Sequence, residues 1–188
     1  MSRKGQMGKM EQGLTLLELI VVVAIIAIIG FFGFPAMDGW QSGRRVEAHF
    51  EDLNGYLRLL KSEAEARSTT VRITLAGDTL SAFYFDTGGG ATPPSTDCVG
   101  GNWIPYPDNV NPREVVIPVN EATVSGPSRL CFYRDSRASG VPNNSPYTYG
   151  VEHPDGPGGG GYQLQVNQPT GFMSRWQWNT QANTYYQM

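Results

Sequence analysis

The chain is poor in the side chains on which most enzymes and metal sites depend. Its 188 residues include two histidines and two cysteines. His49 lies in a predicted helix and His153 in a glycine-rich turn, which disfavours a catalytic triad or a multi-histidine metal site. Cys98 and Cys131 form no C-x-x-C pair, which disfavours zinc. The composition therefore predicts no catalytic residues, no metal and no cofactor, and hence a protein that is not an enzyme.

Clusters of basic residues are also scarce. Lysine and arginine number 14 against 17 acidic residues, and the formal net charge is −3. Affinity for nucleic acids rests largely on the neutralisation of phosphates by grouped lysines and arginines. Arg129, Arg134 and Arg137 are the nearest approach to a basic patch, and the solvated edge of a strand explains them more simply. The sequence therefore disfavours nucleic acid as a partner.

One long apolar run stands near the N-terminus. Residues 14–34 are apolar apart from Thr15 and a single charged residue, Glu18. A helix needs about 20 residues to cross a hydrocarbon core of about 30 Å. A secretory signal peptide is the rival interpretation, but this run is too long for one and no A-x-A cleavage site follows it. The segment 14–34 is therefore predicted to span a membrane.

Glu18 allows two interpretations. An acid in the first turn of a helix is favoured by the helix dipole and needs no function. If the chain is cut after Gly13, however, the new α-amine of Leu14 lies four residues from Glu18 on the same helix face. That amine is largely cationic at neutral pH, so a matched ion pair becomes available within one chain or between neighbouring helices.

The stretch "GLTLLELIVVVAIIAIIGFFGFP" resembles the N-terminus of type IV pilins and type II secretion pseudopilins. The resemblance implies that residues 1–13 are a class III leader, which a prepilin peptidase removes after Gly13 before methylating the amine of Leu14. It also implies that Glu18 is used in subunit docking and that Pro35 bends the helix. Leu14 stands where this family usually has phenylalanine.

Helical periodicity resumes beyond Pro35. The apolar residues form a single stripe at helical spacing, and the charged residues lie away from it: Arg44, Glu47, Glu51, Arg58 and Lys61. This pattern predicts one kinked helix over 14–67, whose second half packs on a globular head. The stripe consists of Val46, Phe50, Leu53, Leu57, Leu60 and Ala64.

Alternation of period two follows Ser68 and continues to the C-terminus. Residues 69–75 and 79–86 are predicted to form a hairpin with Val71, Ile73 and Leu75 on one face. Segments rich in glycine and proline separate the later strands, so residues 68–188 are predicted to form one small antiparallel sheet or sandwich. The further predicted strands are 113–119, 129–135, 146–152, 161–167 and 174–179. The predicted fold class is α+β, with a long N-terminal helix on an antiparallel, pilin-like head.

Cys98 and Cys131 both fall in this head. Two buried free thiols are one interpretation. A disulfide is the other, and it is permitted if the head lies outside the cytoplasm.

The head also resembles GspH/FimT-type minor pilins. The resemblance lies in "YLRLLKSEAEARSTTVRITL", "CVGGNWIPYPD" and "VNQPTGFMSRWQW". Some members of that subgroup bind DNA through basic residues after the last glycine, but Gly171 is followed here by Phe172 and Met173.

The resemblance as a whole implies a minor pilin, a structural subunit of a type IV pilus. A GspH-like pseudopilin of the type II secretion system is the alternative, and a membrane-anchored enzyme or binding module is a third possibility. The implied partners are other pilins, a prepilin peptidase with N-methyltransferase activity and an inner-membrane assembly platform. The implied location is the bacterial inner membrane, crossed once with residues 68–188 in the periplasm, and then the filament.

Overall fold

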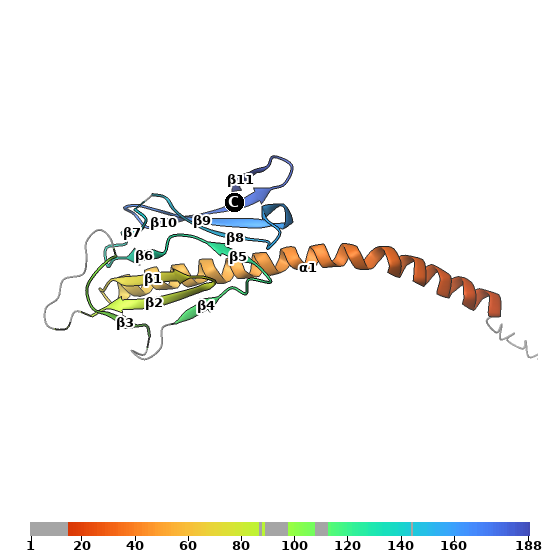
Figure 1. Ribbon diagram of the computed structural model, residues 1–188, viewed down its shortest axis with the longest axis horizontal. Coiled ribbons are helices and arrows are strands. Elements are labelled where there is room, and N and C mark those ends of the chain that lie inside the picture. The colour runs from red at the N-terminus through yellow and green to blue at the C-terminus, as the bar shows by residue number, and fades with distance from the viewer. Residues whose placement is uncertain (1–14, 87, 89–97, 108–112, 144) are drawn as a thin grey trace, which may run out of the picture. The chain divides into compact units, whose positions relative to one another are not determined.

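A computed structural model describes residues 15–86, 88, 98–107, 113–143 and 145–188, without the side chains of residues 31–40. Within these residues it shows one long helix, α1 (Leu16–Ala66), followed by eleven short strands (Figure 1). The chain divides into two compact units, Met1–Gly39 and Trp40–Met188. Helix α1 contributes to both units, and each unit is described separately below.

The predicted leader 1–13 and Leu14 lie outside the described residues, as do the side chains at the end of the predicted membrane span 14–34. No helix that combines the length and the apolar character needed to cross a membrane is found in the described part of the chain.

The second unit contains two antiparallel sheets. The order of the first sheet is β3-β2-β1-β6-β7, and β4 also pairs with β2. Its strands are β1 (Val71–Ala76), β2 (Thr79–Phe85), β3 (Trp103–Pro105), β4 (Glu114–Val116), β6 (Arg129–Phe132) and β7 (Ala138–Val141). The order of the second sheet is β11-β10-β9-β8-β5. Its strands are β5 (Thr123–Ser125), β8 (Tyr147–Glu152), β9 (Gly161–Asn167), β10 (Phe172–Asn179) and β11 (Thr184–Gln187).

The core of this unit forms where the second half of α1 meets both sheets. Each residue of the predicted apolar stripe from Val46 to Ala64 is fully buried. One continuous cluster joins the stripe to inward-facing residues of both sheets, such as Ile73 and Leu164. Phe50 of α1 stacks on Tyr162 of β9 with ring centroids 5.0 Å apart. Because each buried aliphatic side chain contributes about 1.5–3 kcal/mol, the stripe fixes the helix to the sheets.

Helix α1 ends in a Schellman motif. The N–H of Thr69 donates to the carbonyl of Ala64 at 3.1 Å, and the N–H of Ser68 donates to that of Glu65 at 3.2 Å. Ser68 has a φ of 52°, in the left-handed region that glycine usually occupies at this position. The turn directs the chain into β1, and α1 ends within one residue of the predicted boundary.

The first hairpin confirms the period-two prediction. Strands β1 and β2 pair in the register Ala76↔Thr79 through Val71↔Tyr84. The loop between them is Gly77 and Asp78, and Gly77 has a φ of 63°, which suits a tight hairpin turn. The predicted pairing and its turn are therefore both present.

The structure joins Cys98 and Cys131 by a disulfide, with Cα atoms 5.8 Å apart. Both cysteines are fully buried, and they form a small cluster with Tyr133 against which Trp103 packs. The bond ties Cys98 to β6, and free cysteines are absent from the described residues. The disulfide interpretation is the correct one.

Arg129 lies at the end of a strand, but that strand is not at an edge of the sheet. Arg129 belongs to β6, which lies inside the first sheet between β1 and β7. It faces Thr74 on one side and Val141 on the other, and it is only partly exposed. Arg137 pairs with Asp135, with Nε and Oδ2 2.6 Å apart, so its charge is balanced locally.

Candidate functional site

The first described turn of the chain is a capped helix start. The N–H of Glu18 donates to Oγ1 of Thr15 at 3.3 Å, and the N–H of Leu19 donates to the Thr15 carbonyl at 3.2 Å. Thr15 is thus the N-cap of α1, and Thr15 and Glu18 have the spacing of a capping box, S/T-x-x-E. This role of Thr15 was not predicted, although the T-x-x-E spacing of Thr15 and Glu18 could have revealed it.

Glu18 is exposed and is the acidic residue of the first turn of α1. Among the residues that the structure describes, no cation forms an ion pair with its carboxylate. The free N–H groups of the first turn carry partial positive charge, which stabilises an acid at this position. The carboxylate is therefore held at a helix start and remains accessible to a cation from outside the described residues.

Large apolar side chains follow Glu18 as far as Ile29, with only Ala24 and Ala27 between them. Every leucine, isoleucine and valine from Leu16 to Ile29 is exposed, by 47% to 76%. Consecutive helical residues are about 100° apart, so this apolar surface surrounds the helix axis. Exposed apolar patches above a few hundred Å² mark sites that bind protein or lipid. This part of α1 requires an apolar partner.

Pro35 lies inside α1, since the helix continues to Ala66. Proline has no N–H, so the carbonyl of Phe31 lacks its usual intrahelical partner. An interior proline destabilises a helix by about 3 kcal/mol. The helix does not end at Pro35, and the bend there remains a prediction.

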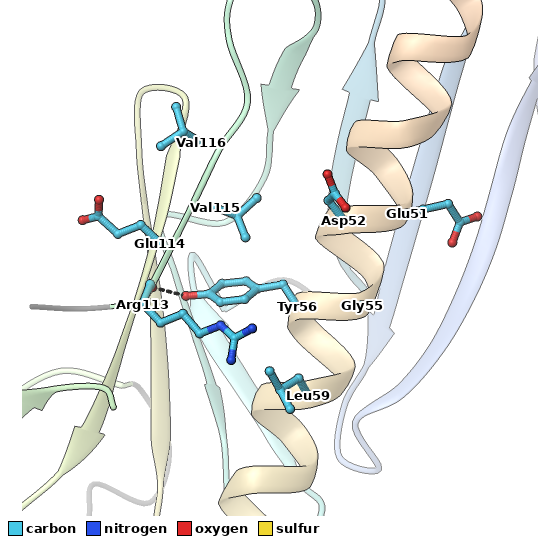
Figure 2. A pocket seen from close by; sticks show the side chains of 9 residues that line it. All are labelled: Glu51, Asp52, Gly55, Tyr56, Leu59, Arg113, Glu114, Val115 and Val116. Atoms are coloured by element: carbon cyan, nitrogen blue, oxygen red, sulfur yellow. Dashed lines mark hydrogen bonds between the residues drawn. The ribbon is translucent and has the colours of Figure 1, made fainter. Parts of the chain in front are cut away.

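One hollow of the second unit lies between α1 and β4 (Figure 2). It has a volume of about 490 Å³, and the ring of Tyr56 reaches across it towards Arg113. The Tyr56 hydroxyl donates to the Arg113 carbonyl, and burial raises the pKa of that hydroxyl far above its usual range. Tyr56 is therefore a neutral hydrogen-bond donor that ties α1 to β4, and it is not available as a base.

The two histidines also have structural contacts. Nε2 of His49 lies 2.8 Å from Oε2 of Glu121, which links α1 to the connection between β4 and β5. Nδ1 of His153 accepts from the N–H of Asp155 at 3.2 Å within a turn. Across the described ranges, no three histidine, cysteine or acidic side chains are close enough to hold a metal ion.

Residues 8–33 match a family model described as the prokaryotic N-terminal methylation motif. The match includes Gly13, Leu14 and Glu18, and it ends two residues before Pro35. The chain thus carries this motif at its N-terminus. No curated protein matches the chain.

Two crystal forms of the type IV minor pilin FimU from Pseudomonas aeruginosa (strain PAO1) are similar to this chain. They are 19% and 20% identical to it, with TM-scores of 0.47 and 0.46. Each comparison covers 69% of this chain, and 87% and 90% of the respective FimU chains.

Proposed function

We propose that this chain is a minor pilin, a non-enzymatic structural subunit that enters a type IV pilus through its N-terminal helix. One observation carries the proposal: the methylation motif at residues 8–33 includes a helical segment whose apolar side chains are exposed from Leu16 to Ile29. A helix that is apolar on all sides needs lipid or other apolar helices around it. A filament built from such helices supplies that environment.

The proposed assembly step depends on a pair of charges. Cleavage after Gly13 creates an amine on Leu14, and methylation leaves that amine basic. In an apolar environment an unpaired carboxylate is costly, by about 2.5–3.5 kcal/mol on insertion scales. Glu18 therefore gains most when it pairs with an amine, either its own or that of an adjacent subunit. Pairing between subunits fixes their register along the filament.

Thr15 supports this step through the backbone. Its side chain fixes the first turn of α1, so the Glu18 carboxylate is presented from an ordered helix start. Pro35, further along, weakens the helix locally, and we propose that it permits bending between the filament part of α1 and the head.

The proposed location follows from the same segment. Before assembly the chain is anchored in the bacterial inner membrane, with residues 14–34 across the bilayer and the head in the periplasm. It then moves into the filament. The Cys98–Cys131 disulfide supports a periplasmic head, because disulfides persist in oxidising compartments. The proposed partners are other pilins, the prepilin peptidase that cuts and methylates the chain, and the inner-membrane assembly platform.

The mass of the intact protein, purified from a pilus-producing bacterium, tests the proposal. We expect a chain that begins at Leu14 and carries one added methyl group. Gly13→Leu should keep the leader, whereas Gly8→Leu, a glycine replacement inside the leader, should still be cut. A wild-type protein that retains residues 1–13 would exclude this function.

A deletion strain tests which machine the subunit serves. We expect the strain to lose surface pili and to secrete folded enzymes normally. Normal pili with blocked secretion would assign the chain to a type II secretion pseudopilus instead.

A further inference from the structure

The outer face of the first sheet carries two arginines on neighbouring strands. The pairing of β1 with β6 places Ile73 opposite Leu130, and both side chains are fully buried in the core. Strand residues alternate between faces, so Arg72 and Arg129, one residue from this pair on each strand, share the opposite face. Burial lowers the pKa of Arg72, and the nearby positive charge of Arg129 lowers it further.

Arg72 differs from the other arginines that lie over aromatic rings. Four arginines in the described ranges have a guanidinium within 5.4 Å of a ring centroid. Three of them also have a carboxylate partner, which neutralises the stacked guanidinium. These pairs are Arg67 with Glu63, Arg137 with Asp135 and Arg175 with Glu51.

For Arg72, no such acid is found among the described residues. Its guanidinium lies 4.4 Å from the ring centroid of Trp103 and 5.2 Å from that of Phe83. Its Nε atom is buried and has no hydrogen-bond partner in the described part of the chain. A buried donor without an acceptor is costly, and a neighbouring charge of the same sign adds to the cost.

We propose that Arg72 and Arg129 bind a small oxyanion, the carboxylate, sulfate or phosphate group of a small molecule. An oxyanion supplies charged acceptors on this face and neutralises both guanidinium groups at once. The rings of Trp103 and Phe83 hold Arg72 in place, so little side-chain entropy is lost on binding. The site is independent of the N-terminal helix, and the proposal does not rest on the function proposed above.

The test is an NMR titration of the full chain in neutral detergent micelles, read at the Nε–H signal of Arg72. Sodium acetate, glucuronate, sulfate and phosphate are added at constant ionic strength, with chloride as the reference anion. We expect a saturable shift of this signal with at least one oxyanion. The ranking of acetate and glucuronate against sulfate and phosphate then identifies the preferred head group.

Two variants and one control separate a site from general attraction of anions. Arg72→Gln or Arg129→Gln should weaken binding by about tenfold or more, because each removes a charged hydrogen-bond donor. Arg137→Gln removes a stacked arginine that already has an acid partner, so it should leave the affinity unchanged. If circular dichroism shows that Arg72→Gln is unfolded, the affinity of Arg129→Gln alone tests the proposal. Absence of a saturable shift, a shift that chloride reproduces, or equal weakening by Arg137→Gln would overturn the proposal.

Discussion

The two halves of α1 have opposite surroundings, although one continuous helix contains both. Between Leu16 and Ile29 the large apolar side chains are exposed at every position. Between Val46 and Ala64 the apolar residues form one buried stripe, and charged residues occupy the other faces. The difference shows how one helix can suit two environments. The second half packs on the sheets of its own chain, whereas the first half keeps its described apolar side chains exposed, as the proposed packing among pilins requires.

Truncation of one apolar side chain in each half gives the largest contrast. Leu57→Ala should lower the free energy of unfolding of the head by about 2–5 kcal/mol, because it leaves a cavity in a fully buried stripe. Ile26→Ala should leave that free energy unchanged, because Ile26 is 63% exposed. Urea unfolding in micelles, followed by near-UV circular dichroism, measures both. Equal effects of the two substitutions would contradict the contrast between the halves.

Removal of the disulfide tests the stability of the head, on which the second half of α1 packs. The double variant Cys98→Ser/Cys131→Ser should lose about 3–4 kcal/mol, since the bond closes a loop with a sequence separation of 33 residues. The helicity of α1 before Pro35 should not change. The wild-type protein under a mild reductant serves as a second measurement of the same loss. Unchanged stability after reduction would mean that the bond does not constrain the unfolded chain.

Alkaline pH should unfold the head through its buried tyrosines. Tyr149 is fully buried, and burial raises its pKa above the usual value of about 10. The neutral Tyr149 side chain therefore makes its full contribution to stability below pH about 10, which is the pKa of tyrosine in the unfolded chain. That contribution is lost as the pH rises further. Tyr149→Phe should reduce this loss. It should also stabilise the head at pH 7 by about 1 kcal/mol, because the buried hydroxyl finds no hydrogen-bond partner among the residues that the structure describes.

The exposed Tyr186 is the matched control for that experiment. Tyr186→Phe should leave the alkaline transition in place, as monitored by tyrosine absorbance and circular dichroism together. If Tyr149→Phe and Tyr186→Phe shift the transition equally, burial of Tyr149 is not its cause.

A substitution at the C-terminal end of α1 should have the smallest effect on the stability of the head. Ser68→Gly should stabilise the head by about 0.5–1 kcal/mol, because glycine adopts the observed φ of 52° without the strain of a side chain. Ser62→Gly, inside the helix, should destabilise by a similar amount. Thermal unfolding of the two variants separates these effects, and destabilisation by Ser68→Gly would argue against the Schellman end.

Long periodic segments were predictable from the sequence. The stripe from Val46 to Ala64 and the β1–β2 hairpin follow from spacing, because one apolar face dominates each of them. Strands β3, β5, β7 and β11 were missed. Each has only three or four residues, and Ala138–Val141 contains serine and glycine, so tertiary pairing defines them more than local propensity does.

The candidate sites, too, were predictable only where contiguous residues define them. The Glu18 position and its motif could be recognised from contiguous residues, and residues 8–33 match the methylation motif. Arg72 and Arg129 are far apart in the sequence, and only the register of β1 and β6 brings them to one face. No short-range pattern could have revealed that Arg72, unlike the other stacked arginines, has no acid partner within the described ranges.

The most direct test of the account is the incorporation of a Glu18→Gln variant into pili. The variant keeps the side-chain shape but loses the charge that we propose pairs with the Leu14 amine. Asp155→Asn, which neutralises a 90% exposed acid on the head, is the control. Immunoblots of sheared pili and of membranes should show Glu18→Gln in the membrane but depleted from pili by tenfold or more, with Asp155→Asn at the wild-type level in both. Wild-type amounts of Glu18→Gln in the pili would contradict the account.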